Sequence, residues 1–459
     1  KNLGAIANST FNSCKALVKV VIPEDAVLAT IGEDAFYECE LMQTITLPES
    51  LTSIDRRAFY RCSSLPKINI PDAVTTIGDN AFQLCSSLAR VQMGTGVTSI
   101  GNTAFGSCES LAAITIPEGV TEIMRETFTS CKTLKSIIIP DAVTAIGERA
   151  FSGCDALVSA TIGNNVKTIA KSSFYHCDVL KTIAIPDATT YIGPNAFNYC
   201  IALETVTLGN GLKTIDEYAF ESCTSLKEIA IPESIESMGT CVFRNCISLT
   251  SATNVISSNY TFDGCKALAT VTINENVTEI GISAFDGCTS LKELVIPEGV
   301  TVMRRYAFRH CSALEQINIP EAVTEIENNA FNSCSSLASI ILPKNLTRIN
   351  GYTFASCSSL TEIIIPDEVT IIDNNAFDDC KAMAKVTLGK NLTILKNYAF
   401  SSCPITECKV YAIEPPVMND TPLSTSAIEF ATANLYVPKG SLTAYQESDW
   451  ATYFGNIIE

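Results

Sequence analysis

Residues 131–154 read CKTLKSIIIPDAVTAIGERAFSGC and hold one unit of a pattern that recurs along most of the 459-residue chain. The leucine and isoleucines of residues 134–139 alternate with other residues, which is typical of a short β-strand. Pro140 then ends the strand, because proline cannot donate a hydrogen bond to a sheet. The A-F-x-x-C segment at 150–154 has small and polar neighbours, and it predicts a tight helical turn that returns the chain to the next strand.

A phenylalanine followed three residues later by cysteine marks each unit, and fifteen of the seventeen intervals between these phenylalanines are 23 residues. The exceptions are 25 residues, from Phe11 to Phe36, and 19 residues, from Phe243 to Phe262. The eighteen are Phe11, Phe36, Phe59, Phe82, Phe105, Phe128, Phe151, Phe174, Phe197, Phe220, Phe243, Phe262, Phe285, Phe308, Phe331, Phe354, Phe377 and Phe400. Self-similarity at such a period indicates a solenoid, in which each unit packs only on its neighbours.

A single 23-residue unit has too few apolar side chains to offset the conformational entropy that it loses on folding, so stacking is obligatory. In-register stacking turns the repeated strands into one parallel sheet, and the Leu, Ile, Val and Phe positions into continuous internal ladders. The predicted fold is therefore a β-rich α/β repeat solenoid of about eighteen units, with the sheet on its concave face.

The unit resembles the BspA-like, or treponemal-type, leucine-rich repeat, as in Leu111-Ala-Ala-Ile-Thr-Ile-Pro117 and Ile146-Gly-Glu-Arg-Ala-Phe151. The resemblance covers about residues 11–403. It implies a leucine-rich repeat superhelix, a surface or secreted location, and a role in attachment to host matrix proteins or to other bacteria. The segment 434–445, NLYVPKGSLTAY, is similar to the closing segment of Bacteroidetes members of this family, which implies a bacterial source of that kind.

We expect two parts in the chain: a solenoid over residues 1–410, with its shortened unit at about 244–262, and a capping segment over residues 411–459. After Cys403 the spacing loses one residue, so that Ile405, Cys408 and Val410 take the apolar positions of a last strand. The residues beyond carry no further A-F-x-x-C, and a solenoid end exposes an apolar layer that has to be covered. The shortened unit predicts a local bend within one domain, or else a partial break between two subdomains.

Composition excludes several function classes. The chain is 47% hydrophobic and 17% charged, which is globular and not disordered. Its net charge of −18 opposes binding to nucleic acid phosphates or to anionic lipid surfaces. No window approaches 18 uninterrupted apolar residues, so we expect no transmembrane segment in this chain.

Eighteen of the twenty cysteines occupy one repeat position and Cys408 replaces a core isoleucine, which leaves Cys241 outside any ladder. Parallel Cβ vectors in adjacent coils disfavour bridging, so we expect buried thiols. The alternatives are a few disulfides, such as Cys241 with Cys246 or Cys403 with Cys408, or a metal site.

The chain lacks the clustered titratable groups that most catalysis requires, and we expect no enzyme, cofactor or metal centre. Its two histidines, His176 and His310, lie six repeats apart, too far to share a site, and are expected to be surface or half-buried turn residues.

Acidic residues follow many of the strand-ending prolines. We interpret them as a solvated rim that keeps an extended sheet soluble, with weak binding of divalent cations as the alternative. They are Glu24, Glu49, Asp72, Glu118, Asp141, Asp187, Glu233, Glu298, Glu321 and Asp367.

One residue per strand, between the two inward isoleucines, should face outward and line the concave sheet. Solenoids commonly bind partners there, although β-propensity alone also explains many of these residues. The binding candidates of this row are Thr115, Ile138, Thr161, Thr207, Asn318, Ile341 and Ile364.

From these features we expect a non-enzymatic, adhesin-like binding protein, extracellular or at the cell surface, acting as a monomer on protein partners. Carbohydrate binding and a structural spacer are the alternatives. The outward row contains no aromatic platform for a sugar, and Tyr218, Tyr306 and Tyr398, two residues before a repeat phenylalanine, are expected to pack in turns.

Overall fold

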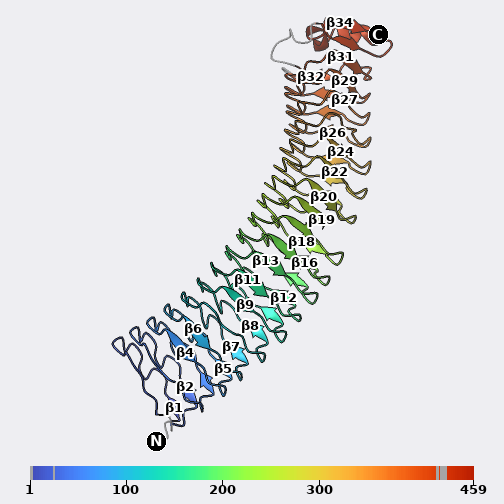
Figure 1. Cartoon of the computed structure of the whole chain (residues 1–459). Helices are drawn as coiled ribbons and strands as arrows, with labels where there is room; N and C mark the ends of the chain where they lie inside the picture. Colours follow the sequence, from blue (N-terminus) through green and yellow to red (C-terminus); the bar gives the residue numbers. More distant parts are fainter. Residues whose placement is uncertain (1–3, 24–25, 420–422, 424–431) are drawn as a thin grey trace. The chain divides into compact units, whose positions relative to one another are not determined.

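The computed structural model describes residues 4–23, 26–419, 423 and 432–459. The chain divides into two compact units, Lys1–Val242 and Phe243–Glu459. Within each unit the repeats form flat coils that stack in sequence order (Figure 1). The predicted β-rich solenoid of leucine-rich repeats is confirmed.

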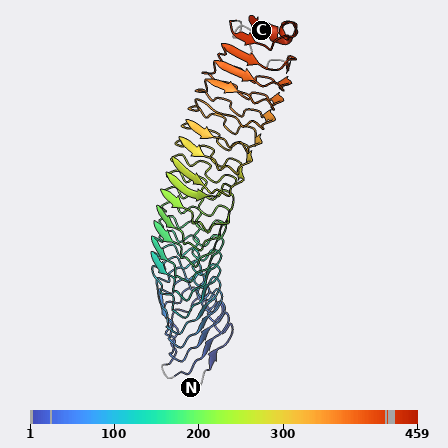
Figure 2. The same cartoon turned by 90° about the vertical axis from the view of Figure 1, so that its right-hand side faces the viewer.

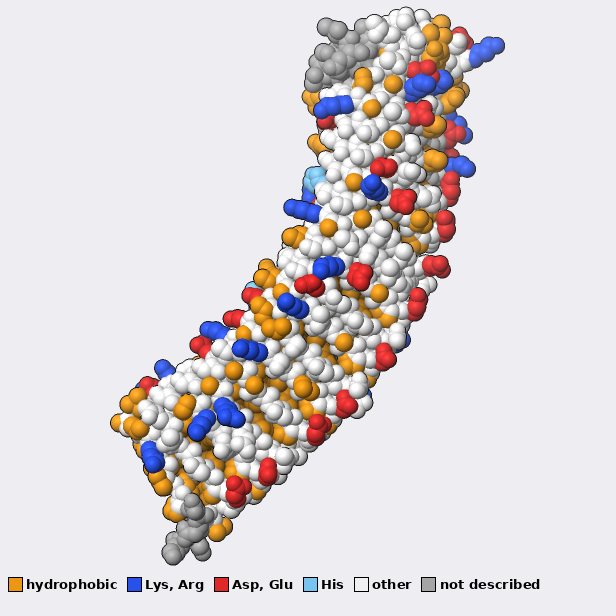
Figure 3. Space-filling model, viewed as in Figure 1, with side chains coloured by type: hydrophobic (Ala, Val, Ile, Leu, Met, Phe, Trp, Pro, Cys, Tyr) orange, Lys and Arg blue, Asp and Glu red, His pale blue; other side chains and the backbone are white. Residues whose placement is uncertain are grey.

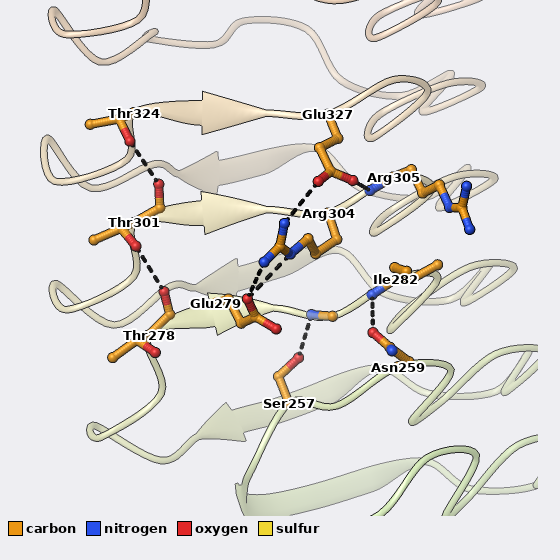
Figure 4. A network of polar contacts seen from close by, with 11 residues as sticks. Ser257, Asn259, Thr278, Glu279, Ile282, Thr301, Arg304, Arg305, Thr324 and Glu327 are labelled. Carbon is orange, nitrogen blue, oxygen red and sulfur yellow. Dashed lines mark hydrogen bonds and ion pairs between the residues drawn. The ribbon is translucent and has the colours of Figure 1, made fainter.

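Each regular coil contains two short strands, where the sequence predicted one. The first strand carries the I-x-I pattern, and the second carries T-x-I, as in β10 (Ala145–Ile146). Both rows pair only in parallel, each residue with its counterpart one repeat later, as Ile146 with Ile169. Successive strands lie side by side along the stack (Figure 2), and in Figure 4 the T-x-I strands run in front of I-x-I strands that point the opposite way. The apolar side chains fill the space between the two rows.

In unit 1 the I-x-I strands are β4 (Lys67–Asn69), β6 (Arg90–Gln92), β9 (Ser136–Ile138), β11 (Ser159–Thr161), β13 (Thr182–Ala184), β15 (Thr205–Thr207) and β17 (Glu228–Ala230). Its T-x-I strands are β1 (Ala5–Ile6), β2 (Thr30–Ile31), β3 (Ser53–Ile54), β5 (Thr76–Ile77), β7 (Ser99–Ile100), β8 (Glu122–Ile123), β10, β12 (Thr168–Ile169), β14 (Tyr191–Ile192), β16 (Thr214–Ile215) and β18 (Ser237–Met238).

In unit 2 the I-x-I row comprises β19 (Ser251–Val255), β20 (Thr270–Ile273), β22 (Glu293–Val295), β24 (Gln316–Asn318), β27 (Glu362–Ile364), β29 (Lys385–Leu388), β31 (Glu407–Val410), β33 (Asn434–Tyr436) and β34 (Asn456–Ile458). Its T-x-I row comprises β21 (Glu279–Ile280), β23 (Val302–Met303), β25 (Glu325–Ile326), β26 (Arg348–Ile349), β28 (Ile371–Ile372), β30 (Ile394–Leu395) and β32 (Val417–Met418). The helices are α1 (Leu442–Gln446) and the 3-10 helix η1 (Asp449–Thr452).

The A-F-x-x-C segment is a series of turns and not the expected helical turn. Around Phe36, the residues Asp34 and Glu38 have φ of 56° and 53°, in the left-handed region that no α-helix uses. The Cys39 N–H bonds back to the Phe36 carbonyl at 3.2 Å, whereas the Phe36 N–H bonds across to Ala58 in the next coil at 2.8 Å. Alternate N–H groups therefore point along the stack, and the turn becomes a third column of hydrogen bonds between coils.

Phenylalanine rings and cysteine thiols form the centre of the core. Consecutive rings stack nearly parallel, as Phe128 and Phe151 do at 5.4 Å between centroids. Thiols of the repeat cysteines donate to the phenylalanine carbonyl of the preceding coil, from Cys39 to Cys403, as Cys131 Sγ does to Phe105 O at 3.3 Å. Cysteine suits this position because it is small and apolar yet can still satisfy a buried carbonyl.

The strand-ending position shows why glycine replaces proline in some coils. A Cβ on Gly163 would lie 2.3 Å from the Pro140 carbonyl oxygen of the preceding coil. Asp141, beside that proline, accepts a hydrogen bond from the Asn164 N–H at 2.7 Å. The same approach recurs at Gly94, Gly209 and Gly389, each of which lies over a Pro-Asp pair. Where one coil carries Pro-Asp and the next coil carries glycine, the two backbones therefore lie too close for a side chain at the glycine position.

The tail of unit 2 continues the I-x-I row. As the sequence predicts, β31 places Cys408 beside Val386 and Val410 beside Leu388. Strand β33 then pairs with β31, and β34 with β33, both in parallel. The buried Trp450 donates from Nε1 to the Pro416 carbonyl at 2.9 Å, which ties the helical segment to the chain below it.

Candidate binding surface

The seven residues expected to line the outward face are all exposed on the I-x-I side of their coils. In unit 1, Ile138 lies beside Thr161 in paired strands, and its side chain is 69% exposed between the buried Ile137 and Ile139. Thr115 and Thr207 occupy equivalent positions in other coils of the unit. These residues form rows along the coils and do not converge on a pocket.

In unit 2, Ile341 and Ile364 are the most apolar consecutive members of the row. Their side chains are 84% and 65% exposed. The Thr361 N–H bonds to the Ala338 carbonyl, so the two coils that carry these isoleucines are in direct contact. Asn318 lies in an earlier coil of the same unit, beside the 75% exposed Val295. The apolar members thus lie on the exposed I-x-I side of their coils.

This row extends further than the repeat pattern indicated. Strand pairing aligns Ile364 with Thr387, then with Lys409, and then with Tyr436 and Ile458 in the tail. The Lys409 ammonium lies 5.9 Å from the centre of the Tyr436 ring and 3.0 Å from a carboxylate oxygen of Glu407. The hydrogen bond that the Lys409 ammonium donates to Glu407 raises the pKa of Lys409, so the cation persists at neutral pH.

Sequence reasoning missed Tyr436 and Ile458 because the tail has lost the 23-residue period. Their local signal was the alternation in N-L-Y-V and N-I-I, in which Leu435 is fully buried and the flanking residues are not. An aromatic residue therefore stands on the outward row after all, next to its single lysine.

An open cleft of about 860 Å³ lies in unit 2 between residues 390–393 and residues 411–417. Its rim is apolar, with Tyr411, Ile413 and Val417 exposed by 57% to 67%. The Tyr445 hydroxyl donates to the Ala412 carbonyl at 2.8 Å, which holds one wall. The cleft offers a recess for apolar groups, and Lys390 and Glu414 also belong to its lining.

The thiols have the wrong environment for nucleophilic chemistry. All twenty cysteines lie in the described residues, none forms a disulfide, and every one except Cys14 is buried. Burial raises the pKa of Cys85 and Cys131 to about 12, so these groups stay protonated at neutral pH. Within the described residues, no three His, Cys, Asp or Glu side chains form a group that could hold a metal ion.

The histidines lie on turns, as expected. His176 Nδ1 lies 3.2 Å from Asp178, and its ring stacks on Tyr199 at 4.7 Å between centroids. His310 Nδ1 lies 3.2 Å from the buried Asp286, which also pairs with Arg309. Each histidine therefore has a carboxylate neighbour.

The acids that follow the strand-ending prolines form an edge of each unit. Acidic side chains lie along the right-hand side of the view in Figure 3. Several bind the backbone of the next coil: Asp72 accepts from Thr95 N–H at 2.8 Å, and this bond lowers the pKa of Asp72. Asp187 accepts from Asn210 N–H in the same way. Glu24 lies outside the described residues. The edge is thus partly structural, and not only a solvated rim.

The polar network in Figure 4 has the same role in unit 2. The Arg304 guanidinium bonds to Glu279 in the preceding coil at 2.7 Å and to Glu327 in the following coil at 3.0 Å. Glu327 also accepts from the Arg305 N–H, while Thr324 Oγ1 donates to the Thr301 carbonyl. These bonds join successive coils and leave no charge aimed at an open site.

A family model for the BspA type leucine rich repeat region (6 copies) matches residues 4–135, 121–250, 255–383 and 347–414. The chain belongs to the BspA-type leucine-rich repeat family. Among solved structures, this BspA-type chain is similar to a leucine-rich repeat protein from Bacteroides ovatus, with 30% identity over 82% of this chain and 87% of that one, at a TM-score of 0.55.

Two further structures resemble this BspA-type protein. A leucine rich cell surface protein from Faecalibacterium prausnitzii is 33% identical over 62% of this chain and 82% of that one, with a TM-score of 0.40. The pneumococcal vaccine antigen PcpA is 21% identical over 74% of this chain and 85% of that one, with a TM-score of 0.43. No curated protein matches the chain. In the described part of the chain, no helix has the length and hydropathy needed to cross a bilayer.

Proposed function

We propose that this BspA-type protein is a non-enzymatic, adhesin-like binding protein that contacts protein partners through the exposed I-x-I face. The observation that supports this most is the row Ile364, Lys409 and Tyr436 on one sheet face of unit 2, with Ile341 exposed on the neighbouring coil. Threonine serves β-propensity equally well at this position, so propensity does not explain exposed isoleucines. Exposed apolar patches and aromatic side chains are typical of protein interfaces.

The same proposal includes location and organisation. We place the protein at the cell surface or outside the cell of a Bacteroidetes-like bacterium, acting as a monomer on host matrix proteins or on other bacterial surfaces. The named relative from Faecalibacterium prausnitzii is a cell surface protein, which supports this location. Residues 1–410 serve as the binding solenoid and residues 411–459 as its cap, since the tail strands β33 and β34 cover the last regular coil of unit 2.

The test compares two glutamate variants of the purified chain. Ile341→Glu with Ile364→Glu changes the proposed face, and Ile371→Glu makes the same chemical change on β28, in the T-x-I row of the coil that carries Ile364. Binding to immobilised host matrix proteins and to neighbouring bacterial cells is measured by surface plasmon resonance and by cell adherence. We expect the double variant to bind at least about tenfold more weakly, and Ile371→Glu to bind like the parent. Equal binding by both variants would refute the proposed face.

A further inference from the structure

A second feature of unit 2 is a set of tyrosines at one position, two residues before the repeat phenylalanine, in every second coil. Polar residues hold the same position in the coils between them. The tyrosines are Tyr260, Tyr306, Tyr352 and Tyr398, and the intervening residues are Ser283, Asn329 and Asn375. We call the four tyrosines the tyrosine row. It lies in the turns that follow the T-x-I strands, so it is separate from the face proposed above for protein partners.

The backbone at this position does not favour an aromatic residue. The four tyrosines have φ between 58° and 63°, in the left-handed region. Such a conformation costs roughly 1–2 kcal/mol for an ordinary L-residue and suits asparagine, which occupies Asn329 and Asn375. The fold therefore gives no local reason for tyrosine at alternate coils.

The contacts of these tyrosines differ from those of tyrosines that support the fold. Tyr445 is buried and its hydroxyl bonds to a backbone carbonyl, and the Tyr191 hydroxyl bonds to Asp216. In contrast, Tyr352 and Tyr398 are 44% and 36% exposed.

No hydroxyl of the tyrosine row has a hydrogen-bond partner among the described residues. The Tyr306 ring packs against the Arg309 guanidinium at 4.5 Å, which orients it. Each hydroxyl is thus available to a ligand.

The spacing of the row follows from the stack. Ring centroids of successive phenylalanines from Phe262 to Phe400 are 5.6, 5.3, 5.2, 5.4, 5.3 and 4.9 Å apart. Taken two coils at a time, these separations give about 10.9, 10.6 and 10.2 Å between repeat phenylalanines. The rings of Tyr37 and Tyr60, which share one turn position in successive coils of unit 1, are 4.8 Å apart, so successive members of the row are separated by roughly 9.6–10.9 Å. A ligand that uses all four tyrosines must repeat at this interval.

We propose that the tyrosine row binds an extended β-1,4-linked polysaccharide, with one tyrosine to every second sugar. The β-1,4 linkage turns each sugar over relative to the one before, so alternate sugars present the same face, at a spacing close to two coils. The apolar face of a sugar packs on an aromatic ring, while the tyrosine hydroxyls supply hydrogen bonds to the sugar hydroxyls.

Extended peptides fit the row less well. A β-strand presents the same face about every 6.8 Å, which does not match two coils. A polyproline helix presents the same face every three residues, about 9.3 Å, which is near the spacing of the row, but it has no N–H group to donate to a tyrosine hydroxyl. Sugar hydroxyls both donate and accept hydrogen bonds on every unit, and this chemistry favours the glycan.

The test uses the full chain and replaces tyrosine by the asparagine that this turn already accepts. Tyr306→Asn with Tyr352→Asn removes the two central members while keeping a residue suited to the left-handed backbone. Tyr199→Asn is the matched control, because Tyr199 has φ of 61° and is 41% exposed in a turn of unit 1. Circular dichroism melting confirms that each variant folds.

Binding of β-1,4-linked hexasaccharides of glucose, xylose and N-acetylglucosamine is measured by calorimetry, with α-1,4-linked and β-1,3-linked glucose hexasaccharides and a proline-rich peptide as comparisons. We expect at least one β-1,4 ligand to bind better than the other linkages, and the double variant to lose about tenfold or more in affinity while the control does not. Affinity should rise from trimer to hexamer, because the longer chain reaches more tyrosines.

Absence of binding by every β-1,4 ligand, or equal binding by parent and double variant, would overturn the proposal. So would tyrosine-dependent binding of the peptide alone. The isoleucine variants of the I-x-I face should leave glycan binding unchanged, so this proposal and the proposed protein-binding function fail separately.

Discussion

Replacing Gly163 by alanine should destabilise unit 1, because the new Cβ would lie 2.3 Å from the Pro140 carbonyl oxygen and 2.6 Å from its carbon. Both atoms are backbone, so the coils themselves must move apart, and such overpacking costs about 1–3 kcal/mol. Unit 1 has 242 residues, and at about 2.1 cal/mol/K per residue its unfolding entropy is about 0.5 kcal/mol/K. The expected fall in Tm is therefore about 2–6 °C.

The control is Gly299→Ala in unit 2, where the nearest atom to the new Cβ is the Val277 carbonyl oxygen, at an ordinary 3.7 Å. Alanine there should leave Tm unchanged or raise it slightly, because it reduces the freedom of the unfolded chain. Melting is followed by circular dichroism, and hydrogen exchange locates the weakened coils beside Gly163. If Gly163→Ala melted like Gly299→Ala, with no local increase in exchange, the close approach of coils over Pro-Asp pairs would not exist in solution.

Three further predictions concern charge, thiols and the tail. Burial raises the pKa of Asp373, but its lysine and arginine partners outweigh this effect, so the pKa in the folded protein is lower than the ordinary value of 3.8. The Asp373 carboxylate therefore stabilises the folded state above about pH 3.8, and this contribution is lost as the pH falls below that value. Asp373→Asn should thus lower Tm at pH 7, and the difference in Tm between the variant and the parent should disappear below about pH 4. A difference in Tm that does not change with pH would contradict this. Thiol reagent at pH 8 should label close to one cysteine per native chain, the exposed Cys14, and all twenty in denaturant, because burial raises the pKa of Cys85 to about 12; rapid labelling of many native thiols would argue against a packed thiol ladder. Trp450→Phe should destabilise unit 2 by about 1–2 kcal/mol through loss of its bond to Pro416, as measured by urea unfolding, and an unchanged midpoint would show that this bond is not stabilising.

The stacked core was predictable because its determinants are local and repeated. Phe151 and Cys154 recur at one spacing, and stacked coils bury both in every unit after the first. The outward positions of Ile138 and Ile364 followed from the same two-residue alternation along a strand. These inferences needed no knowledge of contacts between distant residues, since each coil contacts a near copy of itself.

Other features depended on geometry that no single repeat contains. The turn around Phe36 has helical spacing in sequence, yet left-handed residues direct its N–H groups to the next coil. The outward row continues to Tyr436 because β33 pairs with β31 across 23 intervening residues of aperiodic chain. The bonds of Asp72 and Asp141 to the next coil also appear only when the coils are superposed.

The sequence by itself determined the repeat length, the apolar ladders and the membership of the BspA-type family, because in-register stacking is the arrangement that buries the same apolar positions of successive coils. Tertiary structure decided which polar groups face a neighbouring coil and which face solvent. That distinction depends on separations of a few ångströms between backbones, as at Gly163, and on the rotation of each turn, as at Tyr352. The order of residues alone gives neither the backbone separations nor the rotations of the turns. Both decide where the surface can bind a partner.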